Sequence, residues 1–362
     1  MPSYLNENCS LVSEETSTWM KGFLVFLIVL GHNMSFTVPL EKMGVMSYLY
    51  TFHIHIFFLL PFLYGWKNIS INQITTYIVR FYWPYVLLLL LLSLAYGAIN
   101  DFEKYSLNTF IYAAIFCDAD NIRCVSGTSF LWFLPAFMMT LVLRDFYYRS
   151  SRGIRCILIV LSLSANLYYV LSLIIPTSCK LPVFLLPLGL FSAIRYLFLG
   201  VLLRQIIYWF LFVPRIWLII CSICLFFIGT HVYFSYVSHY VNKDVVIFRI
   251  LAIYMPLPAT LLMQYSSEHF QGIVKRLFFL LGKESLIVYL VSPFLGYAAY
   301  YFIRYCNMES WQMGLLAQIV IISFSYFIAK QLITKTMRSI LFPRTWHELK
   351  LVSTRANKQT LS

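Results

Sequence analysis

Ten long apolar stretches, separated by short polar segments, run through almost the whole chain. Each is close to 20 residues long, the length that a helix needs to cross the hydrocarbon core of a bilayer. The stretches are 21–38, 45–65, 77–99, 129–146, 156–175, 183–203, 214–232, 245–263, 284–303 and 311–330. They predict an all-α protein, a polytopic membrane helix bundle with about ten transmembrane helices. A further run, 108–117, is too short to cross and is expected to form a re-entrant or interfacial helix.

Lysine and arginine are unequally distributed over the loops between these stretches. One side would hold the N-terminus, the loops after the second, fourth, sixth and eighth stretches, and the C-terminal tail. That side receives most of the 27 basic residues, and loops rich in lysine and arginine stay in the cytoplasm. We therefore expect both termini in the cytoplasm of a cell whose inner or plasma membrane holds the protein. We also expect one transmembrane domain over 1–342 and a polar, basic tail over 343–362.

The composition excludes several classes of function. Apolar residues make up 60% of the 362 residues and charged residues only 11%, against about 25% charged residues in an ordinary soluble domain. These values exclude a soluble globular enzyme and a nucleic-acid-binding domain. The net charge of +13 is explained by the cytoplasmic ends of the helices. No residue spacing typical of a metal site occurs.

Ionisable side chains at membrane depth are costly, so each one is a candidate functional group. The residues of this kind inside the predicted spans are His32, His53, His55, Arg195 and Arg249. No aspartate or glutamate lies deep within a predicted span. This argues against a proton-coupled transporter, because such transporters usually relay protons through carboxylates.

Lys21 and His32 are eleven positions apart in the first span. Eleven residues make about three helical turns, so both side chains lie on one face, roughly 16 Å apart along the axis. A cation at the cytoplasmic surface can hold phosphates, and an imidazole at depth can take a proton from a hydroxyl or a thiol. The extended pantetheine arm of coenzyme A has a comparable length. The alternatives are a snorkelling lysine and a histidine that is hydrogen-bonded to a neighbouring helix.

Four segments, in this order, resemble the acyltransferase-three family of integral-membrane acyltransferases, whose members typically O-acetylate cell-surface sugars. They are 21–33 (KGFLVFLIVLGHN), 52–58 (FHIHIFF), 131–136 (LWFLPA) and 282–290 (GKESLIVYL). The resemblance extends from about residue 17 to 335. It implies acetyl-CoA as a co-substrate from the cytoplasmic side, with no tightly bound cofactor. It also implies a hydroxyl acceptor on a surface glycan or a lipid-linked sugar.

The family signature is a basic residue, ten positions and an essential histidine, which Lys21 and His32 match. His32 is then the catalytic base or a transient acyl carrier, and His53 matches the family histidine near the start of the second span. Two features depart from the family pattern. Only Arg80 stands where paired arginines often enter the third span. No histidine follows Tyr289 and Leu290 in the ninth span.

The other candidate residues are assigned to the two substrates. Arg80 would hold the phosphates of the donor together with Lys21. Asn33 would polarise the thioester carbonyl, Trp132 would stack on a sugar, and Arg195 would contact a ligand phosphate. Each also has a plain structural interpretation: Arg80 as a positive-inside anchor, Asn33 in an interhelical hydrogen bond, and Trp132 in the interfacial aromatic belt.

Three other functions stay open on the sequence. A transporter or flippase for a lipid-linked sugar would use ten spans and an intramembrane arginine. A glycan polymerase would favour a basic outer loop, whereas loop 100–128 is acidic. A non-catalytic relative would explain the absent second arginine and the absent histidine of the ninth span. The acceptor sugar, the acyl length and the oligomeric state stay open.

Overall fold

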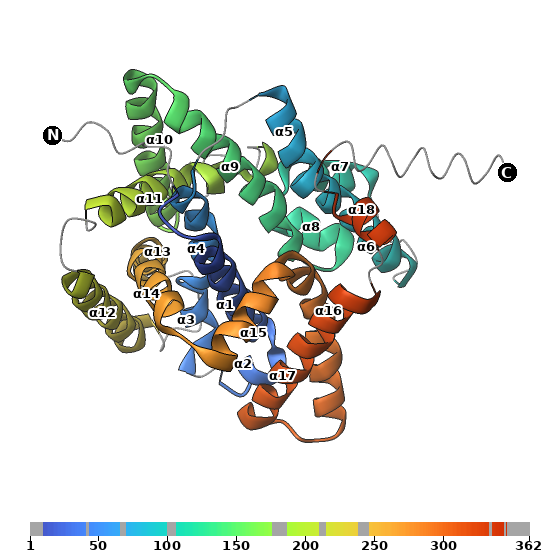
Figure 1. Cartoon of the computed structure of the whole chain (residues 1–362). Helices are drawn as coiled ribbons and strands as arrows, with labels where there is room; N and C mark the ends of the chain where they lie inside the picture. Colours follow the sequence, from blue (N-terminus) through green and yellow to red (C-terminus); the bar gives the residue numbers. More distant parts are fainter. Residues whose placement is uncertain are drawn as a thin grey trace. The chain divides into compact units, whose positions relative to one another are not determined.

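In the computed structural model, described residues are 10–40, 43–65, 70–99, 106–175, 187–209, 215–237, 246–332, 335–343 and 345. All regular elements within these ranges are helical (Figure 1). Nine helical segments there are long and apolar enough to cross a membrane: Val45–Leu63, Ile71–Ala98, Phe130–Arg149, Arg152–Leu171, Leu190–Trp209, Arg215–Tyr236, Val246–His269, Ser285–Tyr305 and Trp311–Gln331. The prediction of an all-α, multi-pass membrane helix bundle is confirmed. Except for residues 343 and 345, the predicted tail lies outside the described residues.

The first predicted span differs from the other nine. Helix α1 (Glu14–His32) begins seven residues earlier than the apolar run, with Ser13 as its N-cap and two glutamates in its first turn. It ends at His32 because Asn33 is extended, with φ −76° and ψ 93°, and the short helix α2 (Met34–Thr37) follows. With its charged first turn, Lys21 and the break at Asn33, α1 is not among the nine candidate spans.

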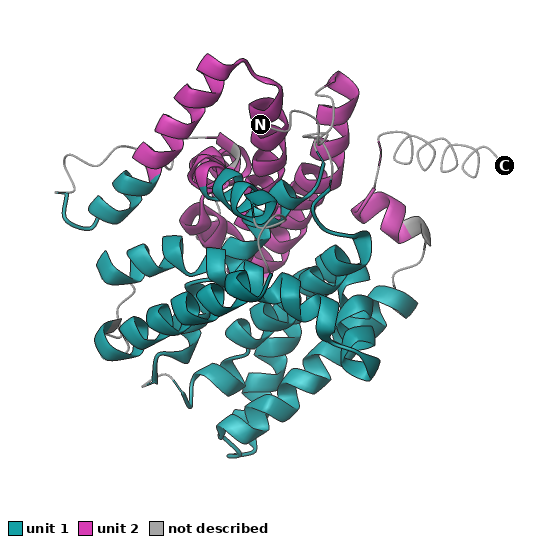
Figure 2. Ribbon diagram, turned by 60° about the vertical axis from the view of Figure 1, so that its left-hand side comes forward, with its two compact units in different colours: residues 1–65, 166–177, 199–332 teal, residues 66–165, 178–198, 333–362 magenta. Residues whose placement is uncertain are grey.

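The chain divides into two compact units (Figure 2). Unit 1 comprises 1–65, 166–177 and 199–332, and unit 2 comprises 66–165, 178–198 and 333–362. The single domain expected over 1–342 stays a prediction. Besides α1 and α2, unit 1 contains α3 (Val45–Tyr50), α4 (His53–Leu59), η2 (Leu60–Leu63), α12 (Arg215–Val232), η8 (Tyr233–Val237), α13 (Val246–Tyr254), α14 (Pro256–His269), α15 (Gly272–Lys283), α16 (Ser285–Tyr305), α17 (Trp311–Phe327) and η9 (Ile328–Leu332).

The elements of unit 2 are α5 (Ile71–Tyr77), η3 (Ile78–Tyr82), α6 (Trp83–Ile99), α7 (Leu107–Phe116), α8 (Ala119–Ser126), η4 (Phe130–Trp132), α9 (Phe133–Arg149), η7 (Pro187–Gly189) and α18 (Lys335–Leu341). The two longest helices that lie wholly in unit 2, α6 and α9, have 17 residues each. The boundary between the units falls within α10 (Arg152–Leu171) and α11 (Leu190–Trp209). Helix α7 is apolar but only ten residues long, too short to cross a bilayer; its re-entrant or interfacial placement stays a prediction.

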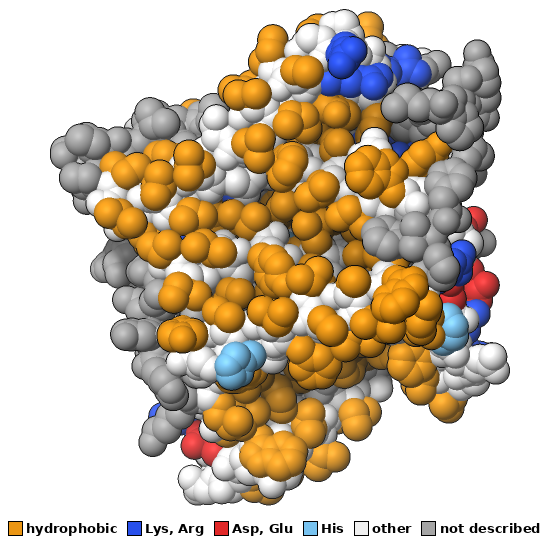
Figure 3. All heavy atoms as spheres, turned by 90° about the vertical axis from the view of Figure 1, so that its left-hand side faces the viewer, with side chains coloured by type: hydrophobic (Ala, Val, Ile, Leu, Met, Phe, Trp, Pro, Cys, Tyr) orange, Lys and Arg blue, Asp and Glu red, His pale blue; other side chains and the backbone are white. Residues whose placement is uncertain are grey.

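Helix α1 lies at the centre of unit 1, where it packs against α4, α14, α15, α16 and α17 (Figure 1). Its buried side chains include Trp19, Met20, Leu24, Val25 and Ile28. By contrast, α10 and α12 expose most of their apolar side chains, as a helix does when it faces lipid. One face of the molecule is covered largely by apolar side chains, with charged ones at its margins (Figure 3).

The contact between α1 and α15 depends on two glycines. A Cβ atom on Gly22 would overlap with the carbonyl oxygen of Phe278, and one on Gly282 would overlap with that of Thr18. Small residues let two helix backbones approach closely inside a membrane. This close approach holds α1, and with it Lys21 and His32, against α15.

We expect Gly22→Ala to destabilise the protein by about 1–3 kcal/mol, because the obstacle is backbone that must shift as a unit. The measurement is the thermal unfolding midpoint of the protein in detergent. Gly153→Ala is the matched control, since a Cβ atom on Gly153, also in a helix, meets nothing within 4 Å. Equal midpoints for the two variants would contradict the prediction.

Candidate functional site

His32 is the last residue of α1, and its two ring nitrogens have different partners. Nδ1 lies 2.8 Å from the carbonyl oxygen of Ile28, and Nε2 lies 2.9 Å from the hydroxyl of Tyr50. A carbonyl oxygen only accepts, so Nδ1 carries the hydrogen. In the neutral imidazole, Nε2 is therefore the basic nitrogen, and it accepts from the Tyr50 hydroxyl. The ring is half-buried.

His53 lies beside this pair at the start of α4. Its Nδ1 donates to the carbonyl of Leu49, and its ring meets the Tyr50 ring edge to face at 4.9 Å between centroids. A Cβ atom on Gly31 would lie 3.7 Å from His53 Nε2, so the His53 ring is next to the last turn of α1. The structure thus brings together the two histidines that the sequence singled out. His55 is also buried, on the same helix.

Tyr50 was missed by the sequence analysis, although it stands only three residues before His53. A turn at Thr51 and Phe52 interrupts the apolar segment between α3 and α4. Tyr50 ends α3 just before this turn, and its hydroxyl reaches His32. The sequence alone indicates only an interfacial or core tyrosine at this position. The hydrogen bond to His32 is what distinguishes Tyr50 from the other tyrosines of the chain.

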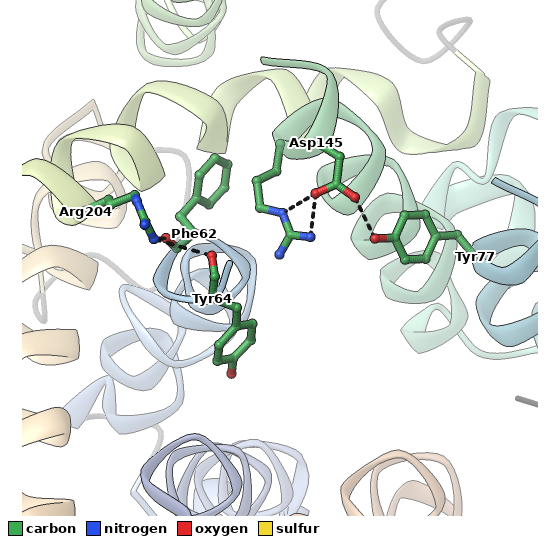
Figure 4. A network of polar contacts seen from close by, with 6 residues as sticks. Phe62, Tyr64, Tyr77, Asp145 and Arg204 are labelled. Atoms are coloured by element: carbon green, nitrogen blue, oxygen red, sulfur yellow. Dashed lines mark hydrogen bonds and ion pairs between the residues drawn. The ribbon is translucent and has the colours of Figure 1, made fainter. Parts of the chain in front are cut away.

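Lys21 lies on the same helix as His32, as predicted, and is half-buried. Its ammonium group is 5.6 Å from the centre of the Tyr64 ring. Arg204, buried on α11, donates from Nη1 to the carbonyls of Phe62 at 2.9 Å and Tyr64 at 3.3 Å (Figure 4). Two cations therefore contact Tyr64, Lys21 at its ring and Arg204 at its carbonyl.

Asn33 occupies the break between α1 and α2 and is 1% exposed. Its Nδ2 donates to the carbonyl of Gly314 at 2.8 Å and to Oε1 of Gln318 at 3.2 Å. Because the Gly314 carbonyl only accepts, the atom facing it must be the nitrogen. Both N–H groups are used, while the buried Oδ1 has no hydrogen-bond partner among the described residues. Asn33 therefore offers an acceptor, rather than the donor that would polarise a thioester carbonyl.

Three other predicted site residues belong to unit 2. Arg80 is exposed in the π-helical turn η3, with its guanidinium 5.3 Å from the Phe81 ring. Trp132 is half-buried in η4 and meets Phe133 edge to face. Arg195 is buried in α11, with its guanidinium 5.7 Å from the Tyr196 ring. Their roles, including the joint phosphate contact of Arg80 and Lys21, stay predictions.

Arg249 is held by polar atoms at the end of α10. Its Nη1 donates to the carbonyl of Tyr169 and to the hydroxyl of Ser172, and its guanidinium lies 4.8 Å from the Tyr169 ring. These contacts offset the cost of desolvating an intramembrane cation. They explain the position of Arg249 without a bound ligand.

A buried carboxylate in unit 2 was not singled out from the sequence. Asp145, at the end of the predicted span 129–146, is 0% exposed. Its Oδ1 accepts from Nε and Nη2 of the buried Arg144 at 2.8 and 2.6 Å, and its Oδ2 accepts from the Tyr77 hydroxyl at 2.7 Å (Figure 4). The last turn of α9 is therefore packed inside unit 2.

A second buried carboxylate, Glu284, lies in the segment 282–290. It joins α15 to α16 and forms an ion pair with Lys330 at 3.0 Å. Glu284 is 6% exposed, whereas Lys330 reaches the surface. This pair ties the start of α16 to η9, which gives the segment a structural function in unit 1.

Among the residues described, no group of three or more His, Cys, Asp or Glu side chains could hold a metal ion. No protein-family model matches the chain, and neither the curated proteins nor the solved structures contain a match.

Proposed function

We propose that this protein is an integral-membrane O-acyltransferase, which moves an acetyl group from acetyl-CoA to a hydroxyl of a cell-surface or lipid-linked carbohydrate. The observation that supports the proposal most directly is the state of His32. Its Nδ1 donates to the Ile28 carbonyl, so Nε2 is the basic nitrogen, and it already accepts a hydrogen bond from a hydroxyl group, that of Tyr50. Lys21 lies on the same helix, three turns toward the predicted cytoplasmic end.

In this proposal, His32 Nε2 acts as the base that takes up a proton as the acceptor hydroxyl loses its own and its oxygen attacks the thioester carbonyl. The bond between the acetyl carbon and sulfur breaks, and the thiolate of CoA takes the proton from the imidazolium. The carbonyl end of α1 carries a partial negative charge, which favours the transient imidazolium at that position. As an alternative, His32 itself carries the acyl group between the two substrates.

The other residues of unit 1 would position the substrates. Lys21 would bind a phosphate of CoA as a point charge. His53, with its own Nδ1 fixed on Leu49, would hold Tyr50 and the last turn of α1 in place. The unpartnered Oδ1 of Asn33 would accept a hydrogen bond from a hydroxyl or a water.

The direct test is an assay of CoA release by the purified protein in lipid nanodiscs with acetyl-CoA and a membrane glycan extract. We expect release of free thiol together with an acetyl signal in the NMR spectrum of the glycan. A flippase for a lipid-linked sugar would move its solute without consuming acetyl-CoA. Transport of the lipid-linked sugar without thiol release would therefore contradict the proposal and favour the flippase.

The same assay tests the role of Lys21. Loss of one contact between a cation and a phosphate costs about 1.5–3 kcal/mol, which corresponds to a rise of about ten- to hundredfold in KM. Lys21→Ala should therefore raise KM for acetyl-CoA while changing kcat little. Lys275→Ala is the control, because Lys275 is paired with Glu15 near the same end of α1. A change in acceptor KM alone would contradict this role.

A further inference from the structure

Tyr50 blocks the direct path from an acceptor hydroxyl to the base. The lone pair of His32 Nε2 is occupied by the Tyr50 hydroxyl at 2.9 Å. A substrate hydroxyl reaches that nitrogen only if Tyr50 moves away. If Tyr50 stays, the proton has to pass through its oxygen.

The surroundings of Tyr50 favour the second route. Its ring packs edge to face against His53 and is tilted against His32, and the turn at Thr51 and Phe52 fixes the backbone directly after it. These contacts hold the half-buried Tyr50 in place, with its hydroxyl on the base.

We propose that Tyr50 is a catalytic residue that relays the proton of the acceptor hydroxyl to His32. This inference rests on the proposed function and adds the acid–base path to it. The acceptor proton passes to the Tyr50 oxygen while the Tyr50 proton passes to His32 Nε2. The acceptor oxygen bonds to the acetyl carbon, the carbon–sulfur bond breaks, and the thiolate of CoA takes the proton from His32. Tyr50 and His32 end each cycle in their starting states.

The chain offers a matched control two residues away. Tyr48 lies on the same helix, is also half-buried, and its hydroxyl bonds to Thr230 at 2.8 Å. Tyr48→Phe therefore removes one tyrosine hydroxyl and one hydrogen bond, as Tyr50→Phe does, without contacting His32.

The first measurement needs no enzymatic activity. Diethylpyrocarbonate acylates the unprotonated nitrogen of an imidazole, and peptide mass spectrometry reports the extent at His32. We expect His32 in Tyr50→Phe to react severalfold faster than in the wild type, because Nε2 loses its hydroxyl partner, and Tyr48→Phe to react at the wild-type rate. An unchanged rate in Tyr50→Phe, at a wild-type unfolding midpoint, would overturn the hydrogen bond on which the inference depends.

The second measurement is acetyl transfer. A positioned proton-transfer group contributes roughly 10²- to 10⁴-fold, so Tyr50→Phe should lose about that factor in kcat and keep its KM for acetyl-CoA. In mixtures of H₂O and D₂O, a plot of wild-type kcat against the deuterium fraction should be curved, as expected when two protons move in the same step. Wild-type kcat in Tyr50→Phe would overturn the relay. Absence of thiol release from the wild type would instead refute the proposed function, with the diethylpyrocarbonate result unaffected.

Discussion

Replacement of His32 by alanine is expected to abolish acetyl transfer in a protein that still folds and inserts into the membrane. The imidazole would supply the only basic nitrogen of the proposed reaction. General-base assistance contributes roughly 10²- to 10⁴-fold, and loss of an acyl carrier would be at least as severe. The measurement is thiol release from acetyl-CoA, with the unfolding midpoint in detergent recorded for each variant.

His269→Ala is a closely matched control for this experiment. His269 also bonds through Nδ1 to the carbonyl four residues earlier, Tyr265, at 2.8 Å, which is the distance between His32 Nδ1 and the Ile28 carbonyl. His269 is exposed at the end of α14, so its replacement removes the same local hydrogen bond away from Tyr50. Full activity in His32→Ala would end the proposed mechanism, and equal losses in both variants would point to a local effect on the helices.

The largest expected effect on stability is that of Asp145→Asn. This change removes the charge that Arg144 and Tyr77 share in the interior of unit 2 and leaves the Arg144 guanidinium without that counter-charge. Removing one partner of a buried ion pair costs about 3–5 kcal/mol. We therefore expect a marked fall in the unfolding midpoint in detergent. Tyr77→Phe, which deletes only one hydrogen bond to the carboxylate, should cost less, about 1.5–3 kcal/mol.

An exposed pair provides the control for Asp145→Asn. Arg215 and Glu268 form an ion pair of similar length, 2.8 Å, but the arginine side chain is 68% exposed. Exposed pairs contribute about 0–1 kcal/mol, so Glu268→Gln should barely move the midpoint. If Asp145→Asn were equally mild, the buried network would not stabilise unit 2 as its geometry implies.

Most of the fold could be predicted from the apolar runs, because crossing a bilayer requires a fixed length of helix whatever the neighbours are. Nine of the ten predicted spans correspond to candidate membrane helices. The run 108–117 was also predicted to be too short to cross. The first span was predicted incompletely. The predicted span 21–38 runs through Asn33, whereas the helix ends at His32, and the Asn33 side chain bonds to Gly314 and Gln318 of α17.

The candidate site was predicted in part. Lys21 and His32 share one face of one helix, which the spacing of eleven residues dictates locally. His32 and His53 were both singled out from the sequence, and the fold brings the His53 ring next to the last turn of α1. The participation of Tyr50 was not expected, since nothing in its local sequence separates it from the other tyrosines of the chain.

The order of apolar and polar residues was enough to establish helical structure, the approximate spans and the common face of Lys21 and His32, because each depends only on neighbours within a few turns. The partners of the buried polar atoms were decided by packing. Asn33 meets Gly314 from the far end of the chain, Arg204 meets the carbonyls of Phe62 and Tyr64, and Asp145 is buried rather than at a surface. A buried donor or acceptor must find its partner wherever the fold provides one, and that choice is made by helices that are distant in sequence.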